Sequence, residues 1–132
     1  MSDRFRFPAF KAAAIQAGSV FRDAPVWFDT DATLAKGVRL IEQAAEEGAR
    51  LVVFPETWLP GFPYWGADVS DDDGLASGSQ GLSRDIWAHY LWSSIEVPGK
   101  ETDILCEVAR RTKTMVVMGI NERDKQFRGR MY

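Results

Sequence analysis

The stretch LVVFPETWLPGFPYW, residues 51–65, decides how the rest of this chain is interpreted. Its first residues, LVVF, are apolar and rich in β-branched and aromatic side chains, which predicts a short strand buried on both faces. Pro55 ends this strand, because proline has no N–H group to donate to a sheet ladder. Glu56 follows at once, and in open α/β sheets ligands bind at the carboxyl ends of the strands. A carboxylate therefore stands where a binding site is expected.

Residues 57–65 form a loop that two prolines stiffen and that is rich in aromatic side chains. An acidic side chain beside a rigid apolar wall is typical of a ligand pocket. Two other interpretations remain open from the residues alone. Glu56 could cap a helix or form half of an ion pair, and the aromatic residues could form a subunit interface, where Trp and Tyr are enriched.

Composition narrows the class of protein. The chain has 132 residues, of which 45% are hydrophobic, enough for one folded domain with a core. The net charge of −3, without a basic stripe, argues against a nucleic-acid partner. One cysteine, Cys106, and one histidine, His89, exclude an internal disulfide and a Cys- or multi-His metal cluster, so no metal is expected. We find neither a signal peptide nor a membrane span and expect a cytoplasmic protein.

The first half of the chain predicts a βαβ unit. Residues 10–17 predict a first strand, buried in the middle of a sheet. Asp29 or Asp31 is expected to cap a helix that stops at Gly48. That helix has one apolar stripe at helical spacing, formed by Leu34, Val38, Ile41 and Ala45. A second strand at residues 51–54 completes the unit, so the two strands should be parallel.

The second half predicts more of the same pattern. Residues 82–94 and 101–113 predict helices joined by an extended connector at 95–99, and residues 115–120 predict a third buried strand. Residues 127–132 resemble the opening of a fourth strand. The acidic triplet at 71–73 is expected to be a solvated loop, because no Glu at calcium-loop spacing follows it. A sheet that ends on a strand leaves an unpaired edge, so we expect residues 1–132 to be one truncated domain.

Four segments resemble, in family order, the nitrilase or carbon–nitrogen hydrolase family. FPE at 54–56 followed by PGFPYW at 60–65 resembles its catalytic-base motif, and the continuation favours the nitrile-hydrolysing branch. AAAIQA at 12–17, IEVPG at 95–99 and VVMGINER at 116–123 resemble its first strand, a connector and a later strand. The resemblance implies an α/β fold: the N-terminal portion of an α-β-β-α sandwich, with a mixed sheet that is incomplete at Tyr132.

The resemblance also implies a Glu–Lys–Cys triad that works without a cofactor. The Cys thiolate attacks the nitrile carbon, Glu takes the thiol proton and later activates water, and Lys stabilises the developing charge. Glu56 matches the family's base. A thiol with a pKa of about 8.5 needs such a base at neutral pH. The residues expected to bind substrate are Trp58, Phe62, Tyr64 and Trp65.

The other two members of the triad are not matched in this sequence. Cys106 lies mid-helix in ILCEV, where an inert packing thiol is expected. His89, which lies among aromatic residues, is expected to pack or to form an interface. The lysines outside the family's motif, expected to be surface residues, are Lys100, Lys113 and Lys125. We therefore expect the 132-residue chain to be inactive alone.

The reaction that the resemblance implies is conversion of a nitrile to a carboxylic acid and ammonia by a homo-oligomer, a dimer or a spiral. An amidase, a carbamoylase or a cyanide-hydrolysing enzyme would share the base and differ in the pocket walls, so the substrate is a small nitrile or amide. A different class remains open: a short non-catalytic module that binds a partner through the aromatic loop and residues 82–94. A nucleotide-binding domain is disfavoured, because Gly18 and Ser19 do not form a G-x-G-x-x-G turn.

Overall fold

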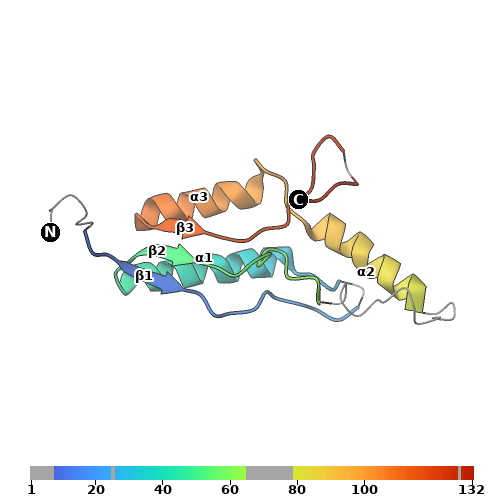
Figure 1. The fold of residues 1–132 in the computed structure, drawn as a ribbon, viewed down its shortest axis with the longest axis horizontal. Helices are drawn as coiled ribbons and strands as arrows, with labels where there is room; N and C mark the ends of the chain where they lie inside the picture. The colour runs from blue at the N-terminus through green and yellow to red at the C-terminus, as the bar shows by residue number, and fades with distance from the viewer. Residues whose placement is uncertain (1–7, 25, 65–78, 128) are drawn as a thin grey trace, which may run out of the picture.

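The computed structural model describes residues 8–24, 26–64, 79–127 and 129–132. Trp65 and the acidic triplet at 71–73 lie outside these residues. The helices and strands follow in the order β1 (Lys11–Ala14), α1 (Thr30–Glu46), β2 (Ala49–Val53), α2 (Ser79–Ser93), α3 (Lys100–Thr112) and β3 (Met115–Val117), as Figure 1 shows.

The three strands form one parallel sheet in the order β1-β2-β3. Ala13 pairs with Val52, and Val52 pairs with Val116, so these three side chains share one face. The parallel βαβ start is confirmed. The prediction that the first strand lies in the middle of the sheet is wrong for the described residues, because each new strand is added on the same side and leaves β1 at the edge.

One face of the sheet is covered by helices α1 and α3, which pack against each other. Ile41 of α1, Val108 of α3 and Val52 of β2 meet in a core from which water is excluded. Burial of such side chains contributes roughly 1.5–3 kcal/mol each relative to leaving them exposed. This shared core fixes the strands against the helices and so holds the carboxyl ends of β1, β2 and β3 in place.

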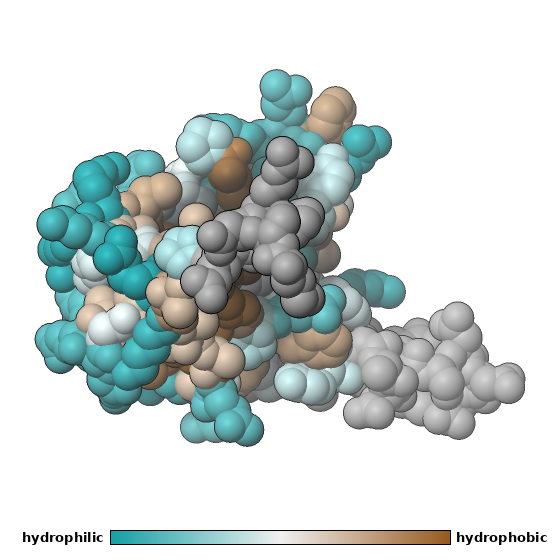
Figure 2. Space-filling view, turned by 60° about the vertical axis from the view of Figure 1, so that its left-hand side comes forward, coloured by the Kyte–Doolittle hydropathy of each residue, from teal (hydrophilic) through white to brown (hydrophobic). Residues whose placement is uncertain are grey.

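The opposite face of the sheet is apolar and open. Its side chains form two cross-strand rows, Ala12–Leu51–Met115 and Ala14–Val53–Val117. Met115 and Val117 are 68% and 50% exposed. The prediction that strand 51–54 is buried on both faces is therefore wrong for the described residues, and so is the prediction that 115–120 form a buried strand, because helices cover one face alone. Figure 2 shows apolar side chains at the surface between hydrophilic ones, at the end of the molecule where the strands begin.

Helix α1 begins and ends as predicted. The Asp29 carboxylate accepts the N–H of Ala32 at 2.8 Å, which satisfies one of the free donors of the first turn. Asp31 lies within that first turn, where its charge suits the positive end of the helix. Gly48 follows the helix with a φ of +88°, a left-handed conformation that glycine adopts at little cost.

The second half of the chain differs from prediction at its end. The two helices lie within three residues of the expected bounds, but β3 ends at Val117 and residues 127–132 form no strand in the described part. Instead Glu122 and Tyr132 exchange backbone hydrogen bonds of 2.8 Å in an antiparallel pairing. The Asp124 carboxylate accepts the N–H groups of Gln126 and Phe127, which turns the chain back on itself.

None of the helices in the described part of the chain combines the length and apolarity that a membrane span requires.

The N-cap makes stability depend on pH. The pKa of Asp29 is lowered, first because its carboxylate accepts the Ala32 N–H and next because it accepts a bond from Arg22. A lowered folded-state pKa means that the ionised form stabilises the fold above about pH 4 and that this contribution is lost as the pH falls further. Asp29→Asn should therefore be less stable than wild type in urea unfolding at pH 7. The difference should shrink at about pH 3.

The matched control for this experiment is Asp23→Asn, an exposed carboxyl in the loop before the helix. It should follow the wild-type stability at both pH values. An Asp29→Asn difference that is the same at pH 7 and at about pH 3 would contradict the assignment of the charge to the cap.

Candidate active site

The site begins where the pairing of β2 with β3 is interrupted. The Phe54 N–H donates to the Val117 carbonyl at 2.8 Å, and pairing resumes when the Leu59 N–H donates to the Gly119 carbonyl at 3.2 Å. Residues 55–58 lie between these bonds and turn out of the sheet. Glu56 is carried in this turn with its side chain exposed. The carboxylate is thus placed at the carboxyl end of the central strand, where the sequence predicts it.

A cleft of about 360 Å³ opens beside Glu56. One wall is the chain that leaves β1, residues 15–19, together with Phe21. The other wall is the loop that leaves β2 and contributes Glu56, Phe62 and Tyr64. The cleft therefore joins the carboxyl ends of two neighbouring parallel strands, the usual position of ligands in open α/β sheets.

Phe62 and Tyr64, which are expected from the sequence to bind substrate, line the cleft together with Glu56. Their ring centroids are 5.0 Å apart with an interplanar angle of 55°, a tilted aromatic pair. Phe62 is 40% exposed and Tyr64 is 72% exposed, so both offer free ring surface to a ligand. Trp65, the next aromatic residue of the loop, is among those that the structure leaves undescribed.

Trp58 has a different place from the other predicted substrate-binding residues. It is 2% exposed and packs against the ring of Phe54 at 4.7 Å between centroids. Its indole N–H donates to the Ala17 carbonyl at 2.6 Å, and the Ser19 hydroxyl donates to the Trp58 carbonyl at 2.5 Å. Trp58 forms the back of the cleft and ties its two walls together.

Sequence reasoning missed the wall that follows β1. Ser19 and Phe21 carry no motif, so nothing in their residue types singles them out. Their position does contain a signal: parallel neighbours in a sheet bring their carboxyl ends to one edge, and these residues follow a strand next to β2. Residues that follow the first strand could therefore have been placed near Glu56 from the βαβ prediction.

The described cysteine and lysines lie outside the lining of this cleft. Cys106 is exposed on α3, so the prediction of a packing thiol is wrong. The reason is its place on an amphipathic helix whose other face, with Leu105 and Val108, packs toward the core. Lys113 and Lys125 are exposed, in agreement with a surface role. His89 is half-buried on α2 and does not line the cleft either.

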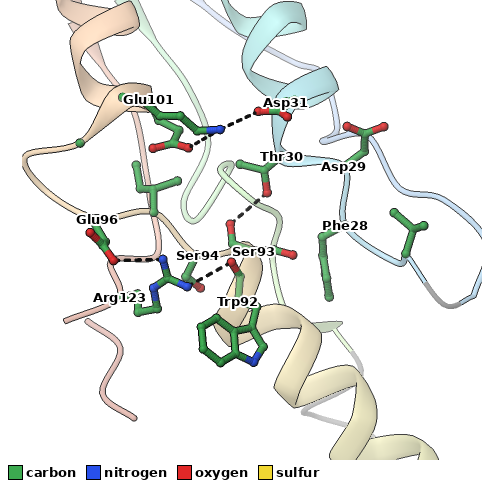
Figure 3. A pocket seen from close by; sticks show the side chains of 14 residues that line it. Phe28, Asp29, Thr30, Asp31, Trp92, Ser93, Ser94, Glu96, Glu101 and Arg123 are labelled. Carbon is green, nitrogen blue, oxygen red and sulfur yellow. Dashed lines mark hydrogen bonds and ion pairs between the residues drawn. The ribbon is translucent and has the colours of Figure 1, made fainter. Parts of the chain in front are cut away.

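A second cavity, of about 590 Å³, lies where α1 and α3 begin, and Figure 3 shows its charged groups in contact with one another. Arg123 donates to the Glu96 carboxylate at 3.1 Å and lies over the ring of Trp92. Lys100 lies 3.3 Å from Asp31 and 3.5 Å from Glu101. The Arg123–Glu96 pair joins the 95–99 connector to the segment after β3, and Lys100 joins the start of α3 to the start of α1, so the cavity is a structural junction.

Within the described ranges, no group of three or more His, Cys, Asp or Glu side chains is placed to hold a metal ion. Among the residues that line the aromatic cleft, the carboxylate is that of Glu56.

The sequence of this chain is similar to those of known proteins. Residues 11–132 match the protein family described as carbon-nitrogen hydrolase. The chain is 38% identical over 125 residues to the bifunctional nitrilase/nitrile hydratase NIT4A of Nicotiana tabacum, a match that covers 94% of this chain and 33% of that protein. It is 38% identical over 106 residues to an arylacetonitrilase of Aspergillus niger, covering 80% of this chain and 28% of that protein. The chain thus spans about a third of the length of the curated relatives that it matches.

The role of Trp58 as a tie between the walls can be tested by Trp58→Phe. This change keeps an aromatic ring and removes the bond to the Ala17 carbonyl. It should lower the free energy of unfolding by about 1–3 kcal/mol in urea titrations, because a partly buried acceptor loses its donor. Trp92→Phe, at a ring that is largely exposed, should change it by less than about 0.5 kcal/mol. Equal effects of the two changes would contradict the assignment.

Proposed function

Because the chain belongs to the carbon–nitrogen hydrolase family, we propose that it supplies the general base of a nitrile-hydrolysing enzyme and that this base is Glu56. At the level of the family it is a nitrilase-type hydrolase. The observation that supports the finer proposal is the place of Glu56, at the carboxyl end of the central strand and in the wall of an aromatic cleft.

In the proposed chemistry Glu56 acts as a base twice. The carboxylate takes the proton of a cysteine thiol as the sulfur attacks the nitrile carbon, and that proton passes to the nitrile nitrogen to give a thioimidate. Glu56 then takes a proton from the attacking water, ammonia leaves, and a second water hydrolyses the thioester to the acid and the free thiol. A lysine ammonium, as the family resemblance implies, stabilises the negative charge that develops during each attack.

We propose that the cysteine and the lysine come from sequence that these 132 residues do not contain. The family's motifs for both residues are unmatched here, and Cys106 lies exposed on α3. The whole enzyme, and with it the activity, would then need more chain than is described. We further propose, on the family resemblance, that it works in the cytoplasm as a homo-oligomer, a dimer or a spiral.

The cleft suits an organic nitrile with an apolar side chain. Phe62, Tyr64 and Phe21 offer ring faces around a volume of about 360 Å³. Trp58 closes the back of the cleft and sets its depth. A planar aromatic or a compact aliphatic group fills such a surface with dispersion contacts, and one relative is named an arylacetonitrilase.

A second product is suggested by the name of another relative, a bifunctional nitrilase/nitrile hydratase. After water has added to the thioimidate, the tetrahedral intermediate can expel ammonia or the thiolate. Expulsion of ammonia leads to the acid, whereas expulsion of the thiolate releases the amide. The proton that Glu56 holds decides between them, because ammonia leaves only from a protonated nitrogen.

The role of Glu56 can be tested in the polypeptide as its gene encodes it. Glu56→Gln keeps the size of the side chain and removes the base, so kcat/KM for an arylacetonitrile should fall by about 10²–10⁴-fold. Released ammonia and the acid-to-amide ratio are the readouts. The matched control is Glu46→Gln, an exposed residue at the end of α1, which should leave kcat/KM unchanged. Full activity of Glu56→Gln would remove Glu56 from the mechanism.

The 132-residue chain offers a separate test. Incubated with aromatic and aliphatic nitriles, it should release no ammonia above the uncatalysed rate, because the base alone forms no covalent intermediate. Its exposed Cys106 is the thiol to control for. Turnover that Cys106→Ser abolishes would show that this thiol is the nucleophile and that the proposed division of the triad is wrong.

A further inference from the structure

We propose that Gly119 is a positioning residue for Glu56: the lack of a side chain at position 119 sets where the carboxylate stands. Gly119 follows β3 and lies directly against the turn that carries Glu56. It does not line the cleft, so it acts through the turn. The inference rests on the proposed function for the role of Glu56, and on the geometry alone for the role of Gly119.

The contact leaves no space for a methyl group. A Cβ built on Gly119 would lie 2.5 Å from the Pro55 carbonyl oxygen, 2.5 Å from the Thr57 nitrogen and 2.7 Å from the Glu56 Cα. All three are backbone atoms, so no side-chain rotation can relieve the overlap. Contacts this short force the backbone of the turn to move away from β3.

The turn has little freedom to absorb such a movement. Its ends are held by the bonds from Phe54 to Val117 and from Leu59 to Gly119, and Asn121 donates to the Leu59 carbonyl at 2.9 Å. A displacement therefore has to appear within residues 55–58. The added methyl would press on backbone atoms of Pro55, Glu56 and Thr57, so Glu56, at the centre of the three, has to move with them.

The backbone next to Glu56 is already strained. Thr57 has a φ of +43°, in the left-handed region that β-branched residues rarely adopt. Such a conformation persists only where the surroundings enforce it. The Thr57 nitrogen is one of the two atoms nearest to the missing side chain of Gly119, so the close approach of β3 is part of what enforces it.

The consequence for catalysis follows from the precision that proton transfer needs. A general base works within hydrogen-bond reach of the proton it removes, and a displacement of about 1 Å can lower a rate by about 10²-fold. Gly119→Ala should therefore lower kcat by about 10²-fold with a smaller change in KM, since the aromatic walls of the cleft remain.

The test has two parts, with Gly129→Ala as the matched control because a Cβ at Gly129 meets nothing within 4 Å. In the 132-residue chain, NMR should show that Gly119→Ala shifts the resonances of residues 54–59 and that Gly129→Ala does not. In the polypeptide as its gene encodes it, kcat should fall for Gly119→Ala alone. On a Glu56→Gln background Gly119→Ala should cause no further loss, an interaction that a merely structural role would not produce.

A second variant covers the case in which Gly119→Ala does not fold. Thr57→Gly removes the steric strain and widens the conformations open to the turn, so it should keep the wild-type stability and lower kcat several-fold. Wild-type kcat in Thr57→Gly, or unshifted resonances in Gly119→Ala, would overturn the proposal. If the wild-type enzyme hydrolyses no nitrile, the proposed function fails, and the NMR shifts alone decide whether Gly119 sets the turn.

Discussion

The interrupted ladder between β2 and β3 is the constraint on which the rest of this structure depends. Hydrogen bonds on either side of residues 55–58 hold a short turn out of the sheet, and the turn carries Glu56. Without the hydrogen bond from Leu59 to Gly119, the segment after β2 would be an ordinary loop, whose side chains sample many positions. With hydrogen bonds at both ends of the turn, the exposed carboxylate is held by rigid elements, which is what a preorganised catalytic group requires.

The segments that follow all three strands either line the cleft or support it. The segment after β1 supplies one wall, the turn after β2 supplies the acid and the aromatic wall, and the segment after β3 supports the turn from behind. Trp58 links the first two through the Ala17 carbonyl and the Ser19 hydroxyl. The aromatic cleft and the Glu56 carboxylate therefore depend on the same packed core, in which Val52, Ile41 and Val108 set the distance between sheet and helices. A substitution that disturbs this core would therefore alter the site, although the substituted residue does not contact a ligand.

Local sequence patterns predicted the helices and strands well. The exposure of individual side chains depends on tertiary neighbours, which such patterns do not contain. The Asp29 cap, the Gly48 stop and the parallel pairing follow from residue type and spacing, and all three are present. The exposure of Cys106 and of Met115 was not predictable in the same way, since an apolar run looks alike whether or not another layer covers it. The FPE motif placed Glu56, but neither the left-handed Thr57 nor the closeness of Gly119 has a signature in single-sequence patterns, because both depend on residues far apart in the chain.

The most direct test of the account is a crystal structure of the polypeptide as its gene encodes it, at a resolution that places carboxylate oxygens. The account predicts a cysteine sulfur within about 3.5 Å of the Glu56 carboxylate, across the cleft lined by Phe62 and Tyr64. A Glu56 side chain that points into open solvent with no thiol near it, or that is paired to an arginine away from the cleft, would contradict it.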